Sequence, residues 1–224
     1  IIPSLIVAIL LIILIPSLLF FSKAKKVYSN IQPIIGSTDL GNVDKLKSDL
    51  VIIKNSVKEL RSSYTLISWM RVVPFAGTYV KDLGHGLNAS AKVLDVSELA
   101  FTTVDPFLSE LGFKAGDDAE TAEKSAQERI DFVVNSIPQI TPKLDEISKN
   151  FVEAEVELSQ IDPNDYPEKY KGMVVREKLK SGLDLFKTIS EYIADSKPIL
   201  ESAPYHLGGE EERRYLVLFQ NKKK

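Results

Sequence analysis

The chain has 224 residues, of which 44% are hydrophobic and 26% charged, a balance typical of a folded protein rather than a disordered one. The formal net charge is −3, and there is no cysteine, which excludes disulfides, thiolate metal sites and cysteine catalysis. Neither half of the chain is strongly basic, so we expect no nucleic-acid partner.

The N-terminal segment, residues 1–21, carries no charged side chain, and three lysines follow it at Lys23, Lys25 and Lys26. A helix of this length spans roughly 30 Å, the thickness of the hydrocarbon core of a bilayer. The segment is longer than the apolar region of a cleaved signal peptide, and a buried core helix is the competing interpretation. We expect a transmembrane anchor at residues 1–21 and a juxtamembrane linker at residues 22–41.

The next part of the chain, residues 42–205, shows apolar side chains at steps of three and four, which predicts amphipathic helices around a common core. The first stripe begins at Val43, and Leu50 is expected inside the core. This helix should end near Val73, because Pro74 disfavours helical geometry in the residue before it.

The second stripe covers residues 80–111 and is less regular. Gly84 and Gly86 each weaken a helix by about 1 kcal/mol, and Asp105-Pro106 could break it in two. The sequence therefore predicts a second helical segment of lower intrinsic stability than the first.

The third stripe, over residues 130–161, keeps its phase across Pro138 and Pro142, which favours one kinked helix over two helices in line. Phe151 of this stripe is expected in the core. A loop at residues 162–167 leads to the fourth stripe, over residues 175–200.

Four helices with short connections predict an all-α fold, an antiparallel up-down four-helix bundle. In that order the loop at residues 162–167 lies beside the turn at Pro74, at the end away from the anchor. The fourth helix then returns toward the membrane.

The tail departs from the helical pattern. After Gly208 and Gly209, residues 213–220 read RRYLVLFQ, which is typical of a strand. A lone strand has no partner in an all-helical chain. We therefore expect residues 206–224 to begin a truncated α/β domain, with one orphan C-terminal β-strand.

Two segments resemble a known family. Residues 207–210, LGGE, and residues 213–221, RRYLVLFQN, resemble a signature of the bacterial domain-of-unknown-function family numbered 4012. Residues 68–77, SWMRVVPFAG, resemble the P-x-x-G turn of that family. The resemblance implies an anchor, a helical region and a short strand, and an association with envelope polysaccharide loci. It ends at Asn221, so no activity of the family's α/β portion carries over.

Chemically distinctive side chains are few. His85 and His206 lie far apart in the sequence without a zinc-binding pattern, and both are expected to be surface histidines. No phosphate-binding loop, dinucleotide fingerprint or nucleophile elbow is present in the sequence. Trp69 and Tyr64 could form a sugar platform, although core packing explains them as well. We predict no catalytic, cofactor-binding or metal-ligating residue, no cofactor and no enzyme activity.

Two acidic groups invite a cation-binding interpretation. The run at residues 210–212 is three glutamates, which are more often simply solvated. Asp162, Asn164 and Asp165 resemble a calcium loop only faintly, because the glycine and glutamate that such a loop needs do not follow.

These patterns favour a membrane-anchored, extracytoplasmic helical stalk or interaction module that is non-catalytic by itself. The expected localisation is a single-pass membrane protein, and the expected partners are the lipid bilayer and an envelope protein or glycan. One alternative is a fragment of an envelope glycopolymer-handling enzyme whose catalytic domain lies outside this chain, which the orphan strand favours. A further alternative is a ligand-sensing four-helix bundle, which would ordinarily have a second transmembrane span.

Overall fold

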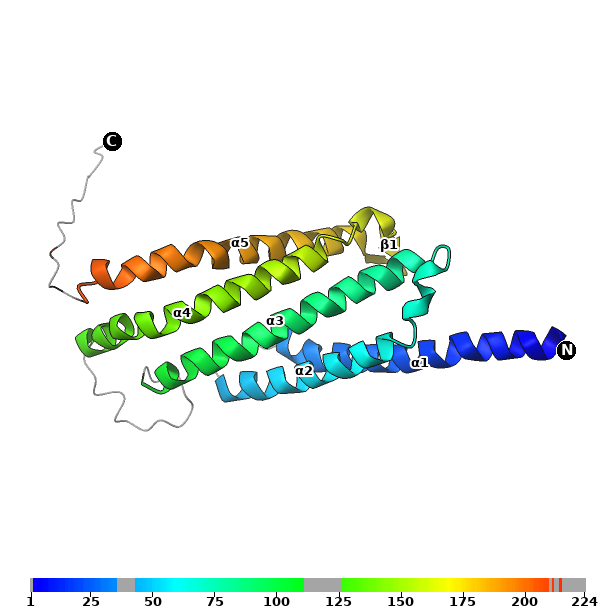
Figure 1. Cartoon of the computed structure of the whole chain (residues 1–224), viewed down its shortest axis with the longest axis horizontal. Helices are drawn as coiled ribbons and strands as arrows, with labels where there is room; N and C mark the ends of the chain where they lie inside the picture. The colour runs from blue at the N-terminus through cyan, green and yellow to red at the C-terminus, as the bar shows by residue number, and fades with distance from the viewer. Residues whose placement is uncertain (1, 36–42, 111–125, 210, 212–213, 215–224) are drawn as a thin grey trace.

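A computed structural model of the chain describes residues 2–35, 43–110, 126–209, 211 and 214. This part of the chain is mostly helical, as predicted (Figure 1). Its α-helices are α1 (Ile2–Ile35), α2 (Val43–Tyr64), α3 (Gly77–Glu110), α4 (Ala126–Leu158) and α5 (Arg176–His206). Its short elements are the 3₁₀ helices η1 (Ser68–Val72) and η3 (Pro163–Asp165) and the strands β1 (Lys169–Tyr170) and β2 (Met173–Val174).

Helices that follow one another in the chain pack side by side: α1 with α2, α2 with α3, α3 with α4, and α4 with α5. The chain reverses direction at each connection (Figure 1). The four stripes of the sequence correspond to α2, α3, α4 and α5. The turn between α2 and α3 and the connection between α4 and α5 lie at the same end, as the predicted order requires (Figure 1).

The tightest core lies near that end. Leu60, Tyr64 and Ile67 from α2 and the turn after it are buried together with Val80 and Leu87 of α3. These side chains follow the predicted heptad spacing, because a repeat near 3.5 residues keeps one face of a helix against its neighbour. Other stripe positions are less enclosed: Leu50 is half-buried, not fully buried as predicted.

Helix α4 shows the same partial burial at Phe151, whose ring stacks on Phe186 of α5 with a centroid distance of 5.7 Å. The prediction that α4 is one helix across Pro138 and Pro142 is confirmed. Helix α3 likewise continues through Asp105-Pro106, so the potential break there is absent.

Helix α2 ends earlier than predicted, at Tyr64 rather than near Val73. Beyond Tyr64 the backbone bonds tighten to a three-residue spacing: the amide of Ile67 donates to the carbonyl of Tyr64 at 3.0 Å, and that of Met70 to Ile67 at 2.9 Å. The backbone therefore changes from α-helical to 3₁₀ geometry in η1 before it reaches Pro74.

The segment predicted as a linker, residues 22–41, is helical over its first part, because α1 continues without interruption to Ile35; residues 36–41 lie outside the described part. Two of the three lysines that follow the apolar segment hold α1 to α2. Lys23 and Lys26 donate to Glu59 at 2.7 and 3.2 Å, and these contacts keep the pKa of Glu59 below its ordinary value. Asn30 also donates to the hydroxyl of Ser56 at 2.7 Å.

Among the residues that the structure describes, none of the helices combines the length and the apolar character needed to cross a membrane. The predictions of a transmembrane anchor at residues 1–21 and of a single-pass membrane localisation are therefore wrong. Helix α1 continues as one helix past residue 21, where the anchor was predicted to end. Its side chains Phe20, Ala24 and Val27 pack against the core. Helix α1 also runs antiparallel to α2, so its N-terminal end extends past the end that holds the α2–α3 turn (Figure 1).

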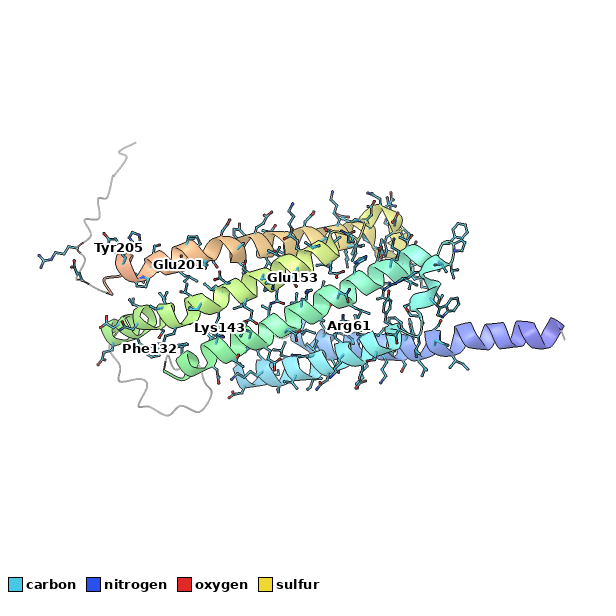
Figure 2. All side chains as sticks on the ribbon, viewed as in Figure 1. Arg61, Phe132, Lys143, Glu153, Glu201 and Tyr205 are labelled. Atoms are coloured by element: carbon cyan, nitrogen blue, oxygen red, sulfur yellow. The ribbon has the colours of Figure 1, made fainter. Side chains whose placement is uncertain are left out.

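Ion pairs join the later helices. Lys92 of α3 pairs with Glu153 of α4, which is labelled in Figure 2, and this contact lowers the pKa of Glu153. Lys197 of α5 lies 2.6 Å from Asp145 of α4, and its pKa is raised by that hydrogen bond. These pairs are partly exposed, so they mainly fix which helix faces meet.

The chain also contains a strand pair that the sequence stripes did not predict. Strands β1 and β2 form a short antiparallel hairpin before α5. Its turn residues Lys171 and Gly172 both have positive φ, at 48° and 81°, which matches a tight two-residue hairpin. The predicted orphan strand within residues 206–224 lies outside the described residues, apart from Arg214.

Candidate functional site

The two most exposed large apolar side chains among the described residues, Phe75 and Val72, belong to the α2–α3 connection. Leu66, Trp69, Val72 and Phe75 are exposed here, and we call them the tip surface. Val72 is 86% exposed and Phe75 is 96% exposed. Scattered apolar side chains are ordinary on protein surfaces, but four within ten residues of one connection form a patch.

The backbone of the tip surface is set by local sequence. Val73 is extended at φ −80° and ψ 126°, as a residue before proline prefers. The amide of Ala76 donates to the carbonyl of Pro74 at 2.8 Å, which closes a three-residue turn around Phe75. Phe75 has a φ of 66°, and turns of this hand are rare and strained for a residue with a side chain.

Gly77 fixes the far side of this turn. Its amide donates to the carbonyl of Val73 at 2.8 Å. A Cβ at Gly77 would lie 2.3 Å from the carbonyl oxygen of Arg71, a backbone atom that cannot move aside. The close approach of the two backbone segments therefore requires glycine, and it orients the tip surface relative to α3.

A hydrogen-bonded group under the tip surface ties the turn to the core. The hydroxyl of Tyr64 donates to the carbonyl of Val80 at 2.7 Å and accepts from Arg71 Nε at 2.9 Å. The Arg71 guanidinium also lies 5.3 Å from the centroid of the Tyr64 ring. Gly84 makes room for this group, since a Cβ there would lie 2.4 Å from the Tyr64 hydroxyl oxygen.

A second aromatic group joins the tip end of α3 to the α4–α5 connection. The rings of Tyr79 and Tyr166 meet edge to face, with centroids 5.2 Å apart. The hydroxyl of Tyr79 donates to the carbonyl of Asp165 at 3.0 Å, and that of Tyr166 donates to Asp82 Oδ2 at 3.0 Å. Burial, and then the hydrogen bond to Asp82, raises the pKa of Tyr166 well above its ordinary range. Asp82 itself is buried at 6% exposure.

Arg176, at the start of α5, holds the α4–α5 connection together. Its Nε donates to the carbonyl of Tyr166 at 2.9 Å, and a terminal nitrogen donates to the carbonyl of Asn164 at 3.4 Å. The guanidinium also lies 3.6 Å from Glu168. The tip end is therefore a fixed platform from which the tip surface projects.

The residues considered for a sugar platform are separated by the fold. Tyr64 is buried at 7% exposure with its hydroxyl engaged, whereas Trp69 is 44% exposed on the tip surface. Core packing explains Tyr64, and Trp69 remains available to a partner.

The faint calcium-loop pattern has a structural explanation. Asp162 Oδ1 accepts from the amide of Asn164 at 2.8 Å and from its side chain at 2.9 Å, so Asp162 caps η3. Of the acidic run, only Glu211 lies within the described residues. No cluster of three or more potential ligands for a metal ion occurs among the residues that are described.

His85, predicted to be a surface histidine, is partly exposed and also has a partner on the next helix. Its Nδ1 lies 2.7 Å from Glu157 Oε2 of α4, and its side chain is 29% exposed. Asn88 donates to the other oxygen of Glu157 at 3.2 Å and accepts from Arg61 of α2 at 3.0 Å. This network links three helices. His206 is exposed at the end of α5, where its ring meets that of Tyr205 edge to face.

Sequence patterns indicated a turn at Pro74 but not a surface site there. The available signal was the composition of residues 72–75, VVPF, because exposed turns usually carry polar residues or glycine. Comparisons with known proteins found no match to a family model, a curated protein or a solved structure. The resemblance to the family numbered 4012 therefore stays a prediction.

Proposed function

We propose that this chain is a non-catalytic helical interaction module that docks another protein through the tip surface. In this proposal α2 to α5 act as an antiparallel up-down four-helix bundle, a rigid body that presents the tip surface at one end. The observation that carries the proposal is Phe75, which combines 96% exposure with a φ of 66°.

This combination is unfavourable for stability alone. A left-handed conformation costs a residue with a Cβ about 1–2 kcal/mol, and an exposed ring gains almost nothing from burial. A glycine or asparagine at this position would relieve the cost. Strained residues that the surrounding structure holds in place are concentrated at binding sites, and this supports a docking role for Phe75.

The neighbours of Phe75 suit a protein partner. Protein interfaces depend on a few central aromatic and large side chains, and the tip surface supplies Trp69 and Phe75 with Val72 between them. The hydrogen bonds of Tyr64 and the tight approach at Gly77 already fix the turn, so little conformational entropy would be lost on docking. An apolar groove on a partner protein is the complementary surface. The envelope protein or glycan partner expected from the sequence remains a prediction.

Site-specific photo-cross-linking in the native host tests this proposal. A photoreactive phenylalanine analogue at Phe75 should give a discrete protein adduct, while the same analogue at Tyr192, 72% exposed on α5, should not. Identification of the adduct names the partner, and the purified partner should then bind the chain directly. Equal products at the two positions, or adducts with lipid alone, would contradict docking to a protein.

A further inference from the structure

An apolar cleft runs along α3, between the α1–α2 pair and the α4–α5 pair. Its volume is about 480 Å³, within the range of small-molecule sites in proteins. Each of the helices α1 to α5 contributes to its walls, for example Val27, Val57, Leu94, Leu158 and Phe186, and no charged side chain lines it. Along α3 the lining extends from residue 83 to residue 94, roughly 16 Å at the rise of a helix.

Gly86 is the feature of this cleft that packing does not explain. A glycine inside a helix costs about 1 kcal/mol relative to alanine. At Gly77 and Gly84 a Cβ would collide with neighbouring atoms, so glycine is required there. At Gly86 a Cβ would meet nothing within 4 Å, and the missing side chain leaves the cleft open.

A smaller recess of about 230 Å³ shares two wall residues, Val57 and Leu94, with the apolar cleft. Lys54, Lys58 and Arg61 of α2 line this recess. The acidic residue in its lining, Asp95, is already paired with Lys54 at 2.8 Å. Arg61, labelled in Figure 2, donates to the neutral side chain of Asn88, so its charge is not compensated by that contact.

We propose that the cleft binds a single-chain anionic amphiphile, with its acyl chain along α3 and its anionic head group at Lys58 and Arg61. The long, narrow and uncharged walls match a flexible aliphatic chain. The adjoining basic recess matches a carboxylate or a phosphate, which guanidinium and ammonium groups bind by charge-assisted hydrogen bonds. A free fatty acid and a lysophospholipid share this chemistry, and the experiment separates them.

Titration of the full chain with cis-parinaric acid, a fluorescent fatty acid, tests the apolar part. The expected result is saturable binding of one molecule per chain. Gly86→Leu fills the cleft and should weaken binding by roughly tenfold or more. Gly182→Leu is the matched control, since Gly182 is an exposed helical glycine of α5 outside the cleft, and it should bind like the parent chain.

Ser90→Leu, one helical turn from Gly86 along the same cleft, repeats the test if Gly86→Leu lowers the helix content. Unchanged binding in the folded variants would overturn the proposal. Non-saturable binding would also overturn it. So would a dimer that closes the cleft, detected by sedimentation experiments without added ligand.

The head-group assignment is tested with competitors. Oleate and oleoyl lysophosphatidate should both displace cis-parinaric acid, and the better competitor identifies the head group. Oleyl alcohol, which has no charge, should compete roughly tenfold less well. Combining Lys58→Gln with Arg61→Gln should remove that difference. An alcohol that competes as well as the acid on the parent chain would overturn the assignment of the head group.

Discussion

Phe75 allows the strain of the tip surface to be separated from its apolar character. Phe75→Gly removes both the ring and the Cβ, whereas Phe75→Ala removes the ring and leaves the Cβ in the left-handed turn. With 96% of the residue exposed, about 4% of a ring area of about 200 Å² is hidden, or about 8 Å². At about 25 cal/mol per Å², the ring contributes only about 0.2 kcal/mol to folding.

We therefore expect Phe75→Ala to leave the free energy of unfolding unchanged within about 0.3 kcal/mol. Phe75→Gly gains about 1–2 kcal/mol from relief of the turn and loses about 0.5–1 kcal/mol through the greater freedom of glycine in the unfolded chain. The net expectation is a gain of roughly 0 to 1.5 kcal/mol, which is at most a few degrees in Tm.

Urea unfolding of the full chain, followed by the helical circular dichroism signal, measures both variants at an unchanged denaturant slope. A loss of more than about 1 kcal/mol in Phe75→Ala would show that the ring is packed in solution and would refute the reasoning. A loss in Phe75→Gly would show that the turn is not strained.

Three further predictions concern the interior. Gly84→Ala should lower the free energy of unfolding by about 2–4 kcal/mol, because the new Cβ displaces the Tyr64 hydroxyl. The control Gly182→Ala, at an exposed helical glycine, should raise it by about 0.5–1 kcal/mol. Equal effects of the two substitutions would contradict the close approach at Gly84. Ser190→Ala should gain about 1 kcal/mol, since Ser190 Oγ is buried with no hydrogen-bond partner among the described residues; a clear loss would reveal a partner. The raised pKa of Tyr166 stabilises the fold below the unfolded pKa of about 10, and this stabilisation is lost as the pH rises further. The free energy of unfolding, measured from pH 7 to 11, should therefore exceed that of Tyr166→Phe by a margin that shrinks above about pH 10. A margin that stays constant over this range would refute the raised pKa.

The helical part of the fold was accessible from the sequence because its signal is local. Val57, Leu60, Tyr64 and Ile67 follow the heptad spacing and are all buried. A helix that packs along one face needs apolar residues at that spacing, whatever its partner is. The end shared by the Pro74 turn and the α4–α5 connection followed from the short connections alone.

The length and packing of α1 could not be predicted from a local pattern in the same way. The apolar run at residues 1–21 dominated the interpretation, and the lysines after it suggested a boundary. Whether Lys23 and Lys26 end a segment or pair with a helix depends on Glu59, more than thirty residues away. No local pattern encodes that contact, and the anchor prediction was wrong.

The candidate sites depend on close approaches that the sequence does not display. Gly77, Gly84 and Gly86 look alike in the sequence. Neighbouring atoms occupy the place of a Cβ at Gly77 and Gly84, whereas the space beside Gly86 is open. Similarly, Phe75 reads as one more apolar residue until its φ and its exposure are known. Such distinctions come from tertiary packing, which overrides the intrinsic preference of each residue.

The affinity of the partner identified at Phe75 tests the central claim most directly. Isothermal titration of that purified partner against the parent chain, Phe75→Ala and Tyr192→Ala compares two exposed aromatic positions. A central interface side chain contributes about 2 kcal/mol or more, so Kd should rise about thirtyfold in Phe75→Ala and stay unchanged in Tyr192→Ala. An unchanged Kd in Phe75→Ala, with the fold intact, would contradict docking through the tip surface.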